Sequence, residues 1–294
     1  MTSYLEIQGQ LATMLAGAFG AMLLEGTKDG ALNVFGFQVA VPWDIAAWEI
    51  YDIFLVDAST YFVAFIIISL IRFVPLKERF IEQGNPFQQL KIGYDYLIKH
   101  KNILIFGIAS YAIFLTVLLE GFYLGAQYAK AHLEADGSVY AASAMYYSVG
   151  AILSGIAIHR IFKAVSIPKA IILLTFLTAA LFFVLAGTKI FWLYYMMLLL
   201  LGITNAGTRV LRVTFLFRNI PNQVYGRANS IFFLTNVMMR ICFIGIFAFP
   251  FFQKDNHVIY TFVILGVFLV LSALILMYYT PLILKKGKTN EKMD

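Results

Sequence analysis

Ionisable side chains inside long apolar stretches are the residues of this sequence most suited to chemistry. Glu120 and Arg240 each lie within a run of apolar residues, and Asp57 lies toward one end of another. Charged groups at membrane depth are costly, so they usually face a cavity or a partner. We therefore take these three residues as candidates for a substrate or proton pathway.

Glu120 is the first candidate for carrying protons. It shares a helical face with Thr116 and Tyr123, because residues three or four apart are neighbours on a helix. Burial favours the protonated form of a carboxyl group, so a carboxylate inside a membrane can load and release protons. Asp57 is the second candidate. Alternatively, Asp57 lies close enough to the membrane surface to be solvated and carries no protons.

Arg240 belongs to a polar stripe. Asn229, Asn236 and Arg240 are spaced by seven and four residues, which places them on one face of a helix. We expect this face to point into the bundle, where Arg240 serves a substrate or ion site or, alternatively, a structural ion pair. A direct pair with Glu120 would have to bridge a difference in depth of roughly 10 Å, at about 1.5 Å per residue.

A second polar stripe consists of Asn205, Arg209 and Arg212, spaced by four and three residues. Asn205 joins the candidates for the substrate pathway. We expect the two arginines to meet lipid headgroups or backbone carbonyl groups at the end of a helix, where positive charge is favoured.

The sequence offers little for catalysis or metal binding. Cys242 is the single cysteine, which excludes a metal site of several cysteines, and neither H-E-x-x-H nor a P-loop occurs. Tyr51-Asp52 lacks the G-x-G-D of an aspartyl protease, and Ser154 and His159 share one predicted helix. We therefore predict that the protein is not an enzyme and holds no metal or cofactor.

The composition indicates that lipid surrounds most of the chain. Hydrophobic residues make up 61% and charged residues 13% of the sequence, against roughly 45–50% and about 25% in soluble domains. The net charge of +6 is divided among short clusters between apolar runs. No single basic patch results, so we do not expect a nucleic-acid partner.

The apolar runs predict an all-α integral membrane protein with about eight transmembrane helices, since each span needs about 20 apolar residues. The first run is short and contains Gln8 and Gln10. The predicted spans cover residues 7–24, 53–71, 103–127, 140–159, 170–186, 190–208, 229–252 and 258–279.

Basic residues predict the orientation of these spans, because cytoplasmic loops carry an excess of Lys and Arg. They concentrate in 72–101, in the fourth-to-fifth and sixth-to-seventh connections, and in the C-terminal tail. The alternate loops contain only Lys28, Lys130, Lys189 and Lys254. We expect both termini to be cytoplasmic.

The segment 73–101 is the longest connection on the predicted cytoplasmic side. After the helix break at Gly84-Asn85-Pro86, apolar residues recur at helical spacing among Lys91 and Lys99. This pattern predicts an amphipathic helix at the membrane surface or, equally, an extension of the third span. The predicted organisation is therefore a two-helix part (1–72), this linker (73–101), a six-helix bundle (102–282) and a tail (283–294).

The stretches QQLKIGYDYLIKHKNILIFGI and YYSVGAILSGIAIHRIFK resemble segments of the major facilitator superfamily, in particular of its branch of enterobactin exporters and macrolide efflux pumps. The first resembles the linker helix that precedes the seventh helix of the family, and the second resembles the eighth helix. LLGITNAGTRVLRVTFLFRNIPNQVYGRANSIFF resembles the tenth helix and the start of the eleventh. MLAGAFGAMLL and DASTYFVAFIII are similar to the fifth and sixth. The resemblance implies that the chain corresponds to helices five to twelve and lacks the first four.

The same resemblance implies a conformational latch at the cytoplasmic ends of helices. Gly226-Arg227 matches a Gly-Arg pair of the family in which the arginine holds helix ends in one conformation. Gly155 and Arg160, with Lys163, resemble a degenerate copy of the basic loop, in which His159 replaces the expected aspartate. Gly155 is also a candidate for close helix packing, together with Gly150 and Ala151.

The function implied by the resemblance is proton-coupled efflux of a small amphipathic molecule across the bacterial inner membrane. The implied partners are the lipid bilayer, the small-molecule substrate and protons. A transporter of this kind needs two helical halves. The alternatives are therefore a fragment or half that depends on another chain, or a protein that translocates lipid.

Overall fold

The structure is a computed structural model of the 294-residue chain, and it describes residues 4, 8–16, 23, 26, 31–34, 37–40, 46–72, 85–135 and 137–290. The chain divides into two compact units. The smaller unit is Met14–Gly84, and the larger unit combines Met1–Thr13 with Asn85–Asp294.

The smaller unit contains one long helix and one pair of short strands. Helix α2 (Ile50–Leu70) begins at Glu49, whose backbone N–H donates to the Asp52 carboxylate at 3.3 Å. Strands β1 (Ala31–Val34) and β2 (Phe37–Ala40) pair antiparallel. The sequence pattern predicted only helices, and this pair is too short and too isolated for apolar periodicity to reveal it.

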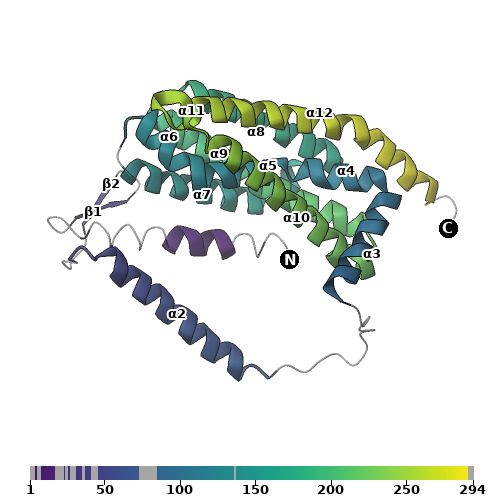
Figure 1. Ribbon diagram of the computed structural model, residues 1–294, viewed down its shortest axis with the longest axis horizontal. Coiled ribbons are helices and arrows are strands. Elements are labelled where there is room, and N and C mark those ends of the chain that lie inside the picture. The colour runs from purple at the N-terminus through teal and green to yellow at the C-terminus, as the bar shows by residue number, and fades with distance from the viewer. Residues whose placement is uncertain are drawn as a thin grey trace. The chain divides into compact units, whose positions relative to one another are not determined.

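The larger unit is a bundle of helices (Figure 1). Within it α7 lies beside α9, and α12 lies beside α8. Its elements are α3 (Pro86–Lys99), α4 (Lys101–Ser110), α5 (Ala112–Leu119), the π-helix η1 (Glu120–Leu124), α6 (Gly125–Ala131), α7 (Gly137–Ile161), α8 (Ile167–Gly187), α9 (Phe191–Asn219), α10 (Asn222–Phe247), α11 (Pro250–Gln253), the 3-10 helix η2 (Asp255–His257) and α12 (Val258–Asn290).

Six helices among the described residues are long and apolar enough to cross a membrane. The structure therefore agrees with the expected class, a mainly helical, multi-pass membrane protein. The predicted fourth span lies in α7, whose apolar stretch, Ala142–Ile158, is shorter. The predicted first span, 7–24, lies partly outside the described residues, of which 8–16 are helical. The count of eight spans stays a prediction.

Two predicted helix ends are wrong. The sixth span was expected to end at residue 208, but α9 continues to Asn219 because no helix breaker occurs before Pro221. The seventh was expected to reach residue 252, but α10 ends at Phe247 and Pro250 begins the short helix α11. The first correction moves Arg209 and Arg212 from a helix end into the body of α9.

The linker forms a helix of its own. Asn85 caps α3 by accepting the backbone N–H of Phe87 at 3.5 Å, and α3 ends at a turn at His100 before α4 begins. This separation favours an individual amphipathic helix over an extension of the third span. Gly93 packs on α10, where an added Cβ would lie 2.9 Å from the carbonyl oxygen of Arg227. Tyr94 on α3 is exposed.

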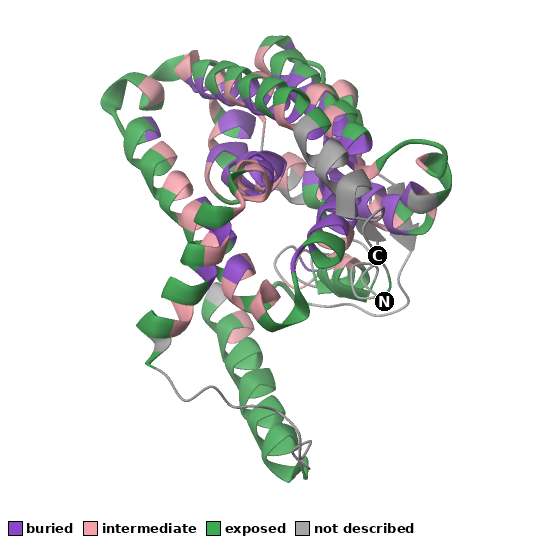
Figure 2. Ribbon diagram, turned by 90° about the vertical axis from the view of Figure 1, so that its right-hand side faces the viewer, coloured by how far each residue is buried: buried purple, intermediate pink, exposed green. Residues whose placement is uncertain are grey.

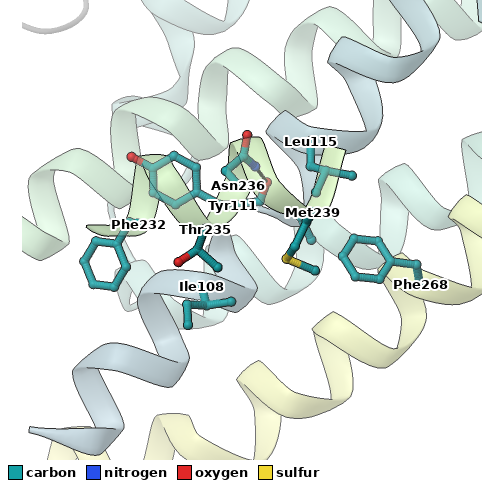
Figure 3. Close-up of a pocket in the computed structure, with 9 residues that line it drawn as sticks. Ile108, Tyr111, Leu115, Phe232, Thr235, Asn236, Met239 and Phe268 are labelled. Atoms are coloured by element: carbon teal, nitrogen blue, oxygen red, sulfur yellow. Dashed lines mark hydrogen bonds between the residues drawn. The ribbon is translucent and has the colours of Figure 1, made fainter. Parts of the chain in front are cut away.

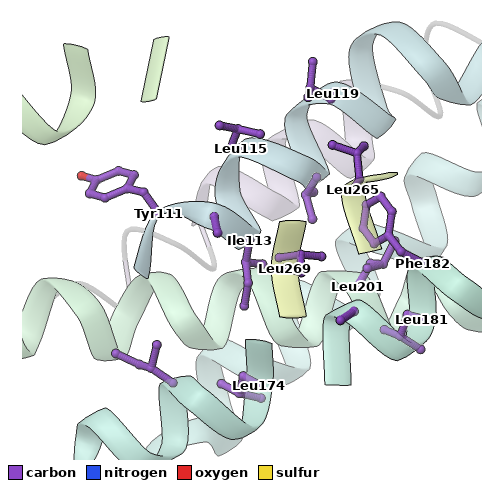
Figure 4. Close-up of a cluster of buried hydrophobic side chains, with 14 of the residues drawn as sticks. Tyr111, Ile113, Leu115, Leu119, Leu174, Leu181, Phe182, Leu201, Leu265 and Leu269 are labelled. Carbon is purple, nitrogen blue, oxygen red and sulfur yellow. The ribbon is translucent and has the colours of Figure 1, made fainter. Parts of the chain in front are cut away.

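The interior of the larger unit is packed by apolar side chains of α5, α8, α9 and α12. Figure 4 shows Leu115, Leu174, Phe182, Leu201 and Leu269 in this cluster, and all five are buried. Figure 2 shows that the helices expose much of their outward-facing surface. In lipid, helices associate through close van der Waals packing rather than through removal of apolar surface from water.

Glycines allow α7 and α9 to approach most closely. A Cβ added at Gly150 would lie 1.9 Å from the carbonyl oxygen of Leu199, and one at Gly202 would lie 2.0 Å from that of Tyr147. Ala151 is fully buried beside them. The predicted close packing at Gly150 and Ala151 is confirmed.

A hydrogen-bonded group ties α6 to the connection between α8 and α9. The two ring nitrogens of His132 lie 2.8 Å from the carbonyl oxygen of Thr188 and 2.6 Å from Oδ1 of Asn256. Tyr128 donates to the carbonyl oxygens of Leu185 and Thr188 at 2.6 and 3.0 Å. His132 thus joins three separate segments at the α6 end of the unit.

We predict that Gly150→Leu destabilises the protein by about 3 kcal/mol or more, because the larger side chain forces α7 and α9 apart. The measurement is the melting temperature of the purified chain in detergent. Gly245→Leu is the matched control, since nothing lies within 4 Å of an added Cβ there. Equal melting temperatures for the two variants would contradict the close packing.

We predict that His132→Leu lowers the free energy of unfolding by about 1–3 kcal/mol, because the part-buried Asn256 side chain and the Thr188 carbonyl each lose a hydrogen-bond partner. His257→Leu is the control, since His257 is less buried than His132 and bonds only Phe251 within its own segment. Denaturant unfolding followed by tryptophan fluorescence compares the two variants. The role assigned to His132 is wrong if His257→Leu costs as much.

Candidate functional site

The span Lys101–Ala131 is interrupted twice. The first break is Ser110–Tyr111, where α4 ends and the N–H of Tyr111 donates to the carbonyl of Ile108 at 3.1 Å. The second break is the π-helix η1, which begins at Glu120. The span contains no proline, and at the first break the Ser110 hydroxyl donates to the carbonyl oxygen of Gly107 at 2.8 Å.

Side chains from α9 and α10 bond the backbone at the first break. The guanidinium Nη1 of Arg212 donates to the carbonyl oxygen of Ser110 at 3.1 Å. The Nδ2 of Asn236 donates to the carbonyl oxygen of Tyr111 at 3.4 Å (Figure 3). Irregular backbone at membrane depth persists only where such groups satisfy it, so these contacts stabilise the break.

Tyr111 joins the two helices that flank the break. Its ring lies under the guanidinium of Arg212, with 3.6 Å from Cζ to the ring centroid. Its hydroxyl donates to Oδ1 of Asn229 on α10 at 3.1 Å. Tyr111 therefore contacts α9 through its face and α10 through its hydroxyl, and a movement of this side chain would disturb both contacts.

The charge at the first break has no acidic partner in the part of the chain that the structure describes. Arg212 is 3% exposed, and its Nε has no hydrogen-bond partner. In the described part of the chain the one ion pair is that of Lys189 with Glu134, at 3.4 Å and largely exposed. Oδ1 of Asn236, which is 2% exposed, also lacks a partner. A buried, unpaired guanidinium is costly in lipid, so this position is unusual.

A small cavity adjoins the first break (Figure 3). It has a volume of about 10 Å³, which is room for about one water molecule. It is too small for an organic substrate in this conformation. Its lining residues are Ile108, Tyr111, Ala112, Leu115, Phe232, Thr235, Asn236, Met239 and Phe268.

The second break places a carboxylate in the interior of the unit. Glu120 is 3% exposed, and three tyrosines, Tyr128, Tyr140 and Tyr194, lie within electrostatic range of it. Tyr140 donates its hydroxyl to the carbonyl oxygen of Gly121 inside the π-helix. The hydroxyl oxygen of Tyr194 is buried without a hydrogen-bond partner.

Gly125 makes room for this arrangement at the end of the π-helix. An added Cβ would lie 2.8 Å from the Tyr140 ring, 2.9 Å from the Glu120 carbonyl oxygen and 3.2 Å from Oε1 of Glu120. No hydrogen bond or ion pair between described residues involves the Glu120 carboxylate. A carboxyl group in such surroundings can hold a proton without competition from a nearby cation.

Comparison of the chain with family models, curated proteins and solved structures finds no match. The resemblance to the major facilitator superfamily therefore stays a prediction. The roles of the residues described above rest on their geometry alone.

The structure brings some of the predicted pathway residues together and separates others. Asn236 lies at the first break, whereas Glu120 lies at the second. Arg240 is half-buried on α10, its Nε lacks a hydrogen-bond partner, and it forms no ion pair with Glu120. Asn205 donates to the hydroxyl of Tyr147 at 2.6 Å, away from both breaks. Asp57 is exposed on α2 in the smaller unit.

The residues expected to form a latch lie at separate places in the larger unit. Gly226 is exposed with nothing near an added Cβ, and the Arg227 backbone packs against α3. Gly155 is buried in α7, and Arg160 is exposed at the end of the same helix. The side chain of His159 lies outside the described part of the structure. Among the described residues, no group of three or more His, Cys, Asp or Glu could hold a metal ion.

Sequence patterns missed Tyr111 and misjudged Arg212. Tyrosine is common in membrane helices, and nothing in the run around Tyr111 signals a break. Arg212 was interpreted as a residue of a helix end because the length of α9 was underestimated. The expectation that it meets a backbone carbonyl is confirmed, but the carbonyl belongs to Ser110 of another helix.

We predict that Gly125→Ala destabilises the protein by about 1–3 kcal/mol, because the added methyl group overpacks the contact with Tyr140 and the Glu120 backbone. Gly121→Ala is the matched control in the same π-helix region, since nothing lies within 4 Å of its added Cβ. Thermal melting in detergent measures both variants. Similar melting temperatures would show that Gly125 does not maintain the second break.

Proposed function

We propose that this protein is a membrane transporter of the major facilitator type that exports a small amphipathic molecule in exchange for protons. The observation that carries the proposal is the position of Glu120. Its carboxylate is buried in a membrane-spanning segment, at a π-helix, with no cation paired to it among the described residues. Intramembrane carboxylates of this kind mark ion and proton pathways.

The irregular backbone around Glu120 supports the proposal. π-Helical turns occur often at functional sites, and discontinuous helices carry the substrate and ion sites of many transporters. The span that contains Glu120 is interrupted at Tyr111 as well. A span of short pieces can rearrange locally, which alternating access to the two sides of a membrane requires.

The proposal includes a second helical bundle. Transporters of this type bind substrate between two bundles that rock against each other. The six-helix part would therefore work opposite another set of helices. We propose that both termini face the cytoplasm of a bacterium and that the protein lies in the inner membrane, because the basic residues concentrate in alternate loops.

Transport accounts for the sequence better than catalysis does. The apolar composition and the absence of protease and nucleotide-binding motifs from the sequence support this choice. Protons, a small molecule and the lipid bilayer are the proposed partners, and nucleic acid is not among them. Gly226-Arg227, with Gly155 and Arg160, remains the proposed latch, and the contact of Arg227 with α3 would let the linker helix take part.

We predict that Glu120→Gln abolishes proton-coupled efflux, because the amide keeps the size of the side chain but cannot release a proton. The measurement is energy-dependent export of amphipathic dyes and macrolides from cells, with and without a protonophore. Glu134→Gln is the matched control, since Glu134 is 78% exposed and pairs only with Lys189. Efflux by Glu134→Gln should equal that of the unchanged protein.

Protein levels in the membrane must be equal for all variants. If Glu120→Gln exports the dyes as well as Glu134→Gln does, proton coupling through Glu120 is wrong. If the unchanged protein exports none of the compounds although it inserts stably, the proposed function fails for this panel of substrates.

A further inference from the structure

Among the described residues, no acidic side chain forms an ion pair with Arg212. The side chain is 3% exposed, and among the described residues it contacts the Ser110 carbonyl through one hydrogen bond and the Tyr111 side chain through the ring and a side-chain hydrogen bond. The second ring nearby, Phe114, has its centroid 6.0 Å from Cζ. The Nε edge of the guanidinium makes no hydrogen bond.

The groups that interact electrostatically with Arg212 include no acid. They are Tyr111, Arg209 and Tyr225, and Arg209 adds a second positive charge from the same helix. Tyr225, the third member of this group, is half-buried.

A purely structural role for Arg212 explains its hydrogen bond to the Ser110 carbonyl, but it does not explain why this donor is a charged arginine. An uncharged amide could donate to the carbonyl of Ser110, as Asn236 does to that of Tyr111. A buried charge without a counter-ion is destabilising compared with a neutral side chain. Arginine, in contrast, presents a planar set of donors that matches carboxylate and phosphate oxygens.

We propose that Arg212 binds an oxyanion, a phosphate or a carboxylate group, at the Nε edge of its guanidinium while the other contacts hold it on Tyr111. Stacking on an aromatic ring fixes the guanidinium plane, and the unpaired edge supplies the donor for a charge-assisted hydrogen bond. This inference does not depend on transport or on Glu120.

The position of Arg212 limits where the anion comes from. It lies seven residues before Asn219, the last residue of α9, and therefore about 10 Å from that end at about 1.5 Å per residue. This depth is within reach of the headgroup of an anionic lipid and of a soluble anion entering from the same side. Both sources present the same chemistry, and the experiment separates them.

The test measures the melting temperature of the purified full-length chain by tryptophan fluorescence. One arm titrates sodium phosphate against sodium chloride at constant ionic strength. The other arm compares nanodiscs of phosphatidylcholine with nanodiscs that also contain phosphatidylglycerol. A ligand that binds the folded state raises the melting temperature saturably, by roughly 2–5 °C for a chain of this size.

Three variants decide the outcome. Arg212→Gln removes the charge and is expected to weaken anion binding by at least about tenfold, since a hydrogen bond to a charged group is lost. Arg218→Gln is the control, because it removes the same charge from an exposed position in the last turn of α9. Arg212→Lys keeps the charge but loses the planar fork, so we expect an intermediate loss.

A response to phosphatidylglycerol alone supports a lipid headgroup as the source, and a response to phosphate supports a soluble anion. No saturable response to either probe overturns the proposal, as does a response that Arg212→Gln retains. If Arg212→Gln does not fold, Arg212→Lys is compared with Arg218→Lys instead. Equal anion affinities of those two variants overturn the proposal.

Discussion

The contact between Arg212 and Ser110 is the interaction on which the centre of the larger unit depends. It joins α9 to the point where α4 gives way to α5, and it places the guanidinium over the ring of Tyr111. Tyr111 in turn bonds α10 through Asn229. Three helices thus meet through polar contacts at a place where lipid-facing proteins usually rely on apolar packing.

Close approach of helices is the second constraint. Gly150 and Gly202 let α7 and α9 touch along their backbones, and this fixes the position of α9. Because α9 also carries Arg212, ten residues after Gly202, this close packing helps to determine where the charge lies. The close packing of α7 on α9 and the hydrogen bond from Arg212 to Ser110 are therefore connected, because both depend on the position of α9.

Sequence patterns predict the features of this protein that follow from composition, and they miss the features that arise from contacts between helices. The helical membrane class follows from long apolar runs, and Glu120 is recognisable because an acid inside such a run is rare. The length of α9 cannot be read from the apolar pattern. Its C-terminal part contains several arginines, so the sequence there resembles a loop that follows a membrane span. The breaks at Tyr111 and Glu120 involve no proline, so local sequence gives no sign of them. Arg212 gains its burial only when α9 is packed against α4 and α5.

The two breaks divide one span so that the Arg212 guanidinium meets one end of the short helix α5 and the Glu120 carboxyl group lies at the other. Ser110, which accepts from Arg212, and Glu120 are ten residues apart in the sequence, or about 15 Å along a helix, too far for a direct ion pair. Between them α5 is almost entirely buried, with six of its residues in the core. Packed interiors are not continuously deformable. The Arg212 guanidinium and the Glu120 carboxyl group are therefore linked through one buried segment, since each contacts or forms an end of α5.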